Sequence, residues 1–189
     1  SNNKKGYNMK AKYNNLYKFL FLILTMIGYS MTANANENIL LLELKDGVVT
    51  IEMKPEVAPN HVKRIKELVN DGFYDGIKFH RVIAGFMAQT GDPLGNGTGG
   101  SGQNIKAEFN NERHLRGTLS MARAQDPNSA DSQFFICLED APHLNGQYTV
   151  WGQVIDGMEY VDNIKKGEGN NGSIIGEPDI IVSMKIKSN

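Results

Sequence analysis

Short apolar runs separated by glycine-rich connections constrain the fold of this chain most strongly. Between residues 77 and 187 they read IKFHRVI, FMAQ, GTLSMA, QFFICL, YTVWGQV and PDIIVSMKIK. Runs of this length, bounded by turn residues and rich in β-branched and aromatic side chains, predict strands rather than helices. The stretch ILLLELKDGVVTIEM adds two strand-like runs around Lys45-Asp46-Gly47, which is a hairpin pattern. Many short strands predict a closed or sandwiched antiparallel sheet.

Helical periodicity is confined to two stretches. In PNHVKRIKELVNDG, residues 59–72, apolar side chains recur at helical spacing, Pro59 suits a first turn and Gly72 an end. The second stretch is GMEYVDNIKK, residues 157–166. The sequence shows no internal repeat and no low-complexity linker, so we expect one mainly β domain with two helices.

The amino-terminal residues have the pattern of an export signal. After Met9 and three lysines comes the apolar run FLFLILTMIGY, and then Ala33-Asn34-Ala35. This pattern predicts a signal peptide over residues 9–35, an exported, periplasmic domain over residues 36–189, and no stable membrane association after cleavage. The alternative is an uncleaved membrane anchor, although the run is shorter than the roughly 20 apolar residues of a spanning helix. Residues 1–8 precede the first methionine, and we interpret them as a cloning remnant or a misassigned start.

Charge and cysteine content exclude several classes of function. Residues 1–35 hold five lysines and no acid, which leaves 15 basic against 21 acidic residues and a net charge of −6 for residues 36–189. An acidic domain argues against nucleic acid as a partner. Cys137 is the only cysteine, so no intramolecular disulfide can form, and its apolar run predicts a buried hydrophobe rather than a reactive thiol.

The usual catalytic patterns do not fit. GNGTGG, residues 95–100, matches a dinucleotide fingerprint formally, but SGQNIKAEFN follows it and is not a helix start. The four histidines lack metal-ligand spacing, and the sequence contains no G-x-S-x-G nucleophile motif. We therefore expect no metal and no cofactor, and an enzyme of this sequence would work without a nucleophile.

The segment FHRVIAGFMAQTGD, residues 79–92, places a cation among apolar side chains. With a two-residue period Phe79, Arg81 and Ile83 share one face of a strand. Removing an ion from water costs several kcal/mol, so an arginine in that position needs either a hydrogen-bonding or ionic partner or a functional role.

Four segments together resemble cyclophilin-type peptidyl-prolyl cis-trans isomerases: FHRVIAGFMAQTGD, NGTGG, MARAQDPNSADSQFFI and LNGQYTVWGQV. The resemblance runs in order over nearly all of residues 39–187. It implies a closed eight-stranded antiparallel β-barrel capped by two α-helices. It also implies a substrate, the peptide bond before proline in unfolded or partly folded polypeptides, and a role in protein folding. We expect a monomer.

The same resemblance implies roles for individual residues. Arg81 matches the catalytic arginine. The apolar matches to the proline pocket and its wall are Phe86, Met87, Phe135 and Leu144. The polar matches that hold the substrate backbone and orient the arginine are Gln89 and Gln133. The strand along which the peptide would lie matches Ala122, Arg123 and Ala124, where the family often has asparagine in place of the arginine. We expect His80, beside Arg81, to be a hydrogen-bonded structural residue.

Two positions depart from the family. His143 stands where many cyclophilins carry a tryptophan, and Tyr148 stands where many carry a histidine. We predict weak binding of the cyclic peptide inhibitor cyclosporin, because imidazole buries less apolar surface than indole. An alternative function is that of a proline-peptide binding module or a holdase chaperone whose isomerase activity is incidental.

Overall fold

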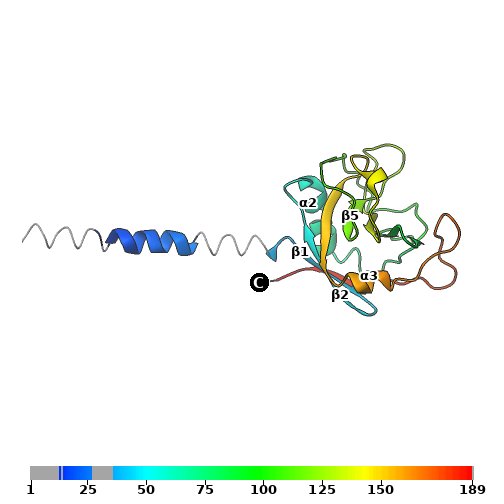
Figure 1. Ribbon diagram of the computed structural model, residues 1–189, viewed down its shortest axis with the longest axis horizontal. Coiled ribbons are helices and arrows are strands. Elements are labelled where there is room, and N and C mark those ends of the chain that lie inside the picture. Colours follow the sequence, from blue (N-terminus) through cyan, green and yellow to red (C-terminus); the bar gives the residue numbers. More distant parts are fainter. Residues whose placement is uncertain (1–12, 14, 27–35, 189) are drawn as a thin grey trace, which may run out of the picture. The chain divides into compact units, whose positions relative to one another are not determined.

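The computed structural model describes residues 13, 15–26 and 36–188. Residues 15–26 are helical (Figure 1), and none of the described helices is long and apolar enough to cross a membrane. The predicted cleavage site and residues 1–8 lie outside the described residues. The chain divides into two compact units, and the fold below is that of the second, Asn38–Lys187.

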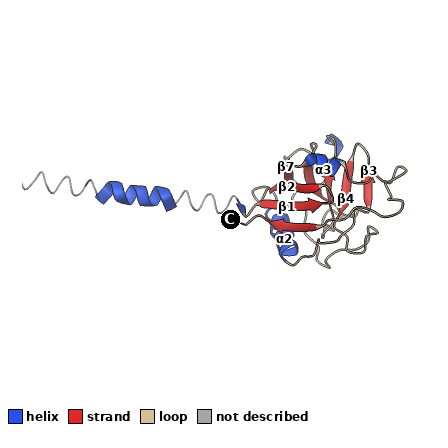
Figure 2. Ribbon diagram, turned by 90° about the horizontal axis from the view of Figure 1, so that it is seen from below, coloured by secondary structure: helices blue, strands red, loops and turns tan. Residues whose placement is uncertain are grey.

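Eight antiparallel strands form one sheet in the order β3-β4-β6-β5-β7-β2-β1-β8 (Figure 2). Their bounds are Ile39–Leu44 (β1), Gly47–Met53 (β2), Arg81–Ile83 (β3), Met87–Thr90 (β4), Thr118–Met121 (β5), Phe134–Cys137 (β6), Val150–Asp156 (β7) and Ser183–Ile186 (β8). Each predicted apolar run overlaps one of them. The predicted hairpin is confirmed, because Leu44 pairs with Gly47 across a two-residue turn.

The prediction of a closed barrel was wrong. β3 and β8 end the sheet order, and no ladder joins them within the described residues. Residues 179–181 cross the gap irregularly: Phe79 N–H donates to the Asp179 carbonyl at 2.8 Å, and Gly76 N–H donates to the Ile181 carbonyl at 2.7 Å. Pro178 has no N–H to donate, so it cannot extend this pairing, and β3 has only three residues that could form a ladder. The sheet is therefore an open half-barrel.

Both predicted helices are present. Helix α2, Pro59–Asn70, packs against β8, and helix α3, Met158–Asp162, packs against β2 (Figure 1). Pro59 occupies the first turn of α2, as predicted. A short 3-10 helix, η1, Pro142–Leu144, was not predicted from the sequence because three residues carry no periodicity.

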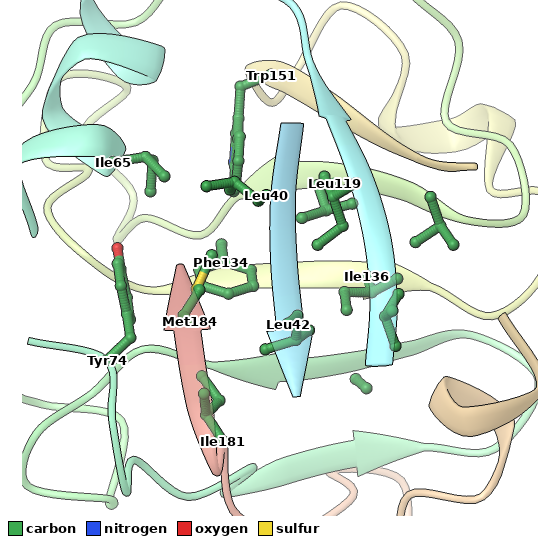
Figure 3. Close-up of a cluster of buried hydrophobic side chains, with 14 of the residues drawn as sticks. Leu40, Leu42, Ile65, Tyr74, Leu119, Phe134, Ile136, Trp151, Ile181 and Met184 are labelled. Atoms are coloured by element: carbon green, nitrogen blue, oxygen red, sulfur yellow. The ribbon is translucent and has the colours of Figure 1, made fainter. Parts of the chain in front are cut away.

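The main core lies between α2 and the sheet (Figure 3). One cluster contains Leu40 and Leu42 of β1, Ile65 of α2, Phe134 of β6 and Trp151 of β7, all fully buried. The Phe134 and Trp151 rings pack edge to face with centroids 5.5 Å apart. This core supports one face of β3, β4 and β6, and the site is built on the other face.

Phe79 does not share a face with Arg81, contrary to the strand prediction. Phe79 is fully buried in the main core together with Val82. Ile83 instead packs on a second cluster around Met87 and Phe135. The two-residue period applies only from Arg81, where β3 begins, and Phe79 precedes it.

Candidate active site

Three neighbouring strands place the predicted side chains in rows. In the register of β3, β4 and β6, Arg81 lies opposite Gln89, which lies opposite Phe135. The next row contains Ile83, Met87 and Cys137. Because alternate residues of a strand point to opposite faces, both rows project away from the main core. Two rows of polar and apolar side chains thus form one platform.

An apolar cavity of about 230 Å³ opens on this platform. Met87, Phe135 and Leu144 are buried in it, and the half-buried Phe86 and Tyr148 flank them. The Phe135 and Tyr148 rings meet edge to face with centroids 5.9 Å apart. Sites for whole small molecules usually occupy about 300–1,000 Å³, so this cavity suits one small ring or side chain.

The Arg81 guanidinium stands at the wall of this cavity. Its Nε donates to the Asn171 carbonyl at 2.9 Å, and its Nη1 donates to Gln89 Oε1 at 3.0 Å. Among the described residues, no carboxylate lies within ion-pairing distance of it. The cation is therefore oriented by two neutral acceptors but not neutralised. Nothing in the sequence pointed to Asn171.

A chain of amide hydrogen bonds orients Gln89. Its Nε2 donates to Gln133 Oε1 at 3.0 Å, so its own Oε1 faces Arg81. Gln133 Nε2 in turn donates to the carbonyls of Gly97 and Gly99, at 3.0 and 2.9 Å. The glycine-rich loop thus holds the arginine through two glutamines.

Asp92 shapes that loop. Its buried carboxylate accepts the N–H groups of Leu94 at 2.8 Å, Asn96 at 3.0 Å and Gly97 at 2.6 Å. Burial opposes ionisation of Asp92, but these bonds outweigh burial and lower its pKa. A Cβ on Gly99 would lie 2.1 Å from Asp92 Oδ1, so only glycine fits there. The amides that a dinucleotide phosphate would need are occupied by Asp92.

A second, more polar cavity of about 300 Å³ adjoins the first. Gln89, Ala122 and Arg123 line both cavities. Ala124 and Gln133, which the resemblance assigned to the site, line only the second one. Residues of this cavity that sequence reasoning missed are Asn104, Ser129 and Asp131. Their polar side chains carry no pattern that distinguishes them from other loop residues.

The rim of the apolar cavity carries the two residues that depart from the family. The exposed His143, on η1, lies against Phe86 with ring centroids 5.5 Å apart, and it does not line the cavity. Tyr148 lines the cavity with one side and carries the Arg123 guanidinium on its ring, 4.6 Å from the centroid.

Two histidines adjoin the platform. His114 Nε2 bonds with Ser120 Oγ at 2.8 Å, and its buried ring stacks on Phe135 with centroids 6.2 Å apart. His80 Nδ1 is buried without a hydrogen-bond partner in the described part of the chain, so the expected bond is missing at that atom. Burial lowers the pKa of both rings, which keeps both of them neutral at pH 7.

Comparisons with known proteins agree with this geometry. Residues 39–186 match the family model of cyclophilin type peptidyl-prolyl cis-trans isomerase/CLD. A Brucella suis protein described as a "probable peptidyl-prolyl cis-trans isomerase" is 51% identical over 176 residues, which cover 86% of this chain and 90% of that protein. Peptidyl-prolyl cis-trans isomerase B of Bacillus subtilis is 48% identical over 128 residues, covering 66% and 89%.

Solved structures of proteins from two organisms have the same fold. A Cryptosporidium parvum cyclophilin type isomerase has a TM-score of 0.73 at 33% identity, covering 80% of this chain and 98% of that chain. A cyclophilin of Hirschia baltica has a TM-score of 0.71 at 30% identity, covering 80% and 74%. On the family match, these relatives and the shared fold, this chain belongs to the cyclophilin-type peptidyl-prolyl cis-trans isomerases.

Proposed function

We propose that Arg81 is the catalytic residue of this isomerase and that its substrates are proline-containing segments of unfolded, exported polypeptides. One observation carries the proposal. Two acceptors hold the Arg81 guanidinium at the wall of an apolar cavity that has the size of one small ring. A solved relative was crystallised in the presence of the dipeptide Ala-Pro, which fits a substrate of this size.

The reaction requires the loosening of a conjugated bond and breaks none. Rotation about a peptide bond has a barrier of about 18–20 kcal/mol, because the nitrogen lone pair is delocalised into the carbonyl. Before proline the two isomers differ by only about 0.5–1 kcal/mol, so unfolded chains contain both and exchange them over tens of seconds or longer. A catalyst must therefore bind the twisted state better than either planar state.

Arg81 can supply that preference. Twisting the bond localises the lone pair on the prolyl nitrogen, and a guanidinium N–H then has an acceptor that the planar amide lacks. An arginine stays protonated at any ordinary pH and presents a rigid fork of donors. One charge-assisted hydrogen bond contributes about 1.5–3 kcal/mol, which is roughly one to two factors of ten in rate.

The apolar cavity provides the rest of the acceleration. Met87, Phe135 and Leu144 would hold the proline ring while the preceding carbonyl turns. A site with little water also strengthens each electrostatic contact with the substrate. Gln89 and Gln133 keep the donor in place, and the backbone of residues 122–124 would hold the substrate chain.

The test is isomerisation of a short proline peptide by Arg81→Ala and Arg81→Lys. Arg81→Ala should lose most activity, and Arg81→Lys should be poor because an ammonium lacks the planar fork. Arg113→Ala is the control, because Arg113 is exposed and lines a different cavity, with Lys54 and Glu56. Turnover by Arg81→Ala equal to that of the unmodified enzyme would refute the assignment.

The holdase alternative is separated by a second measurement on the same variants. If the protein is an isomerase and not a holdase, replacing Arg81 abolishes isomerisation of the proline peptide, and neither the unmodified protein nor the variant protects a proline-free client from aggregation. A holdase would protect that client, and Arg81→Ala would protect it equally well.

The export proposal rests on the composition of residues 9–35. We propose cleavage after Ala35 and release of the domain into the periplasm. Mass spectrometry of the protein from its native host should find Asn36 at the amino terminus, in the soluble periplasmic fraction. An intact Met9 start in the membrane fraction would overturn it.

A further inference from the structure

Arg123 is fixed at the rim of the site in a way that a surface arginine usually is not. Its Nη2 donates to the Gln147 carbonyl at 2.7 Å, and its Nη1 donates to the carbonyl of Ala124 at 2.9 Å. The guanidinium also lies on the Tyr148 ring. These contacts reach from residues 122–124, which follow β5 and do not continue it as the predicted strand, to the loop before β7, so the charge has one defined position.

That charge is not neutralised by a neighbouring acid. Within the described part of the chain, Arg123 forms no ion pair with a carboxylate. Of the residues that the structure describes, no acidic one lines the apolar cavity, whereas both Arg81 and Arg123 do. Two guanidinium groups therefore face one small cavity in a domain whose net charge, over residues 36–189, is −6.

The described residues that line the second cavity include one acid, Asp131, which does not line the apolar cavity. Its carboxylate accepts the N–H groups of Ser101 and Gly102, each at 2.9 Å, and forms no ion pair with Arg123. Arg123 therefore stands at the boundary between the two cavities with its charge available to a substrate.

We propose that Arg123 is a specificity-determining residue that favours polypeptides with an acidic side chain directly beside the proline and disfavours those with a basic one. A proline in the apolar cavity places its flanking residue at the shared rim, where a carboxylate would meet the guanidinium. This inference rests on the proposed function, because it assumes that the apolar cavity holds the proline.

The experiment measures isomerisation of peptides with Glu, Gln or Lys on either side of one proline, by exchange between the cis and trans proline resonances in NMR. This method needs no coupling protease, so the flanking residue affects only the isomerase. The enzymes are the unmodified domain, Arg123→Asn, and Arg113→Asn as a matched control. Arg113→Asn removes the same charge from an exposed position that lines neither cavity of the site.

We expect the unmodified domain to prefer Glu over Lys at one flanking position by about fivefold in kcat/KM, since a partly screened charge pair contributes about this factor. The preference should shrink at high salt, collapse in Arg123→Asn and persist in Arg113→Asn. Because the readout is a ratio between peptides, a general loss of activity in Arg123→Asn does not affect it.

Two outcomes overturn the inference: a Glu-to-Lys ratio near one at both positions in an active enzyme, or the same ratio in Arg123→Asn as in the unmodified domain. Failure of the proposed function looks different, because then the unmodified domain would not accelerate exchange in any peptide.

Discussion

Replacing Gln89 with methionine tests whether the amide chain, and not only the arginine, produces the activity. Methionine is similar in length but removes the acceptor that lies 3.0 Å from Arg81 Nη1. A hydrogen bond to a charged group contributes about 1.5–3 kcal/mol. Arg81 keeps its bond to the Asn171 carbonyl, so the lower value applies, and kcat/KM should fall about tenfold.

The stability of the fold should change little in this variant. Gln133 loses its contact with Gln89 but keeps the carbonyls of Gly97 and Gly99. The variant loses both hydrogen bonds of the Gln89 side chain, but the site is half-exposed and water can replace the missing partners, so each loss costs about 1 kcal/mol or less. Urea unfolding should therefore give a midpoint near that of the unmodified domain, and the loss of activity should lie in kcat.

A double variant shows whether Gln89 acts through Arg81. If it only positions the arginine, then Arg81→Ala with Gln89→Met should be no slower than Arg81→Ala alone. The control is Gln153→Met, which removes the same kind of side chain from β7, where it bonds with Thr118 and Arg116 outside both cavities of the site. A full rate in Gln89→Met, or a further tenfold loss in the double variant, would refute the reasoning.

Three other predictions follow from the same structure. The pH–rate profile should be flat from about pH 7 to 9, because arginine does not titrate there and burial lowers the pKa of His80; a bell-shaped profile would indicate an overlooked acid or base. At the start of α2 the Glu108 carboxylate accepts the backbone N–H of His61 at 2.7 Å and bonds with the ring Nδ1 of His61 at 2.6 Å. Glu108→Gln should therefore lower the free energy of unfolding by about 2 kcal/mol and the Tm by about 4–8 °C. Burial opposes ionisation of Glu108, but these bonds lower its folded-state pKa from 4.5. Its contribution is therefore fully present above that value and declines as pH falls toward the lower folded pKa, so the difference in urea unfolding between the two proteins should be smaller at pH 3 than at pH 7. Cyclosporin should inhibit the enzyme weakly and His143→Trp more strongly at similar turnover, and tight inhibition of the unmodified enzyme in a parallel titration would contradict this.

Much of the fold follows from local sequence patterns. A period of two in MAQT and FFIC determines which side chains enter the main core and which face the site. Turn residues at Lys45-Asp46 determine the first hairpin, and Pro59 with the following apolar positions determines α2. Such patterns depend on contacts within a few residues or across one turn, so the sequence alone is sufficient to predict them.

The resemblance to a family supplied the candidate residues, but only tertiary structure determined how they meet. Arg81 takes its second acceptor from Asn171, 90 residues away, and Arg123 reaches Gln147 across the site. Phe79 turned to the core because β3 begins two residues later than the pattern suggested.

Closure of the sheet also lay beyond the sequence pattern. Strand count and alternation are the same for a closed barrel and for an open half-barrel, because both present alternating inward and outward side chains. The difference lies in whether β3 and β8 come into register after the chain has folded around α2. Pairing between segments about a hundred residues apart depends on the packing of everything between them, and no local pattern contains that information.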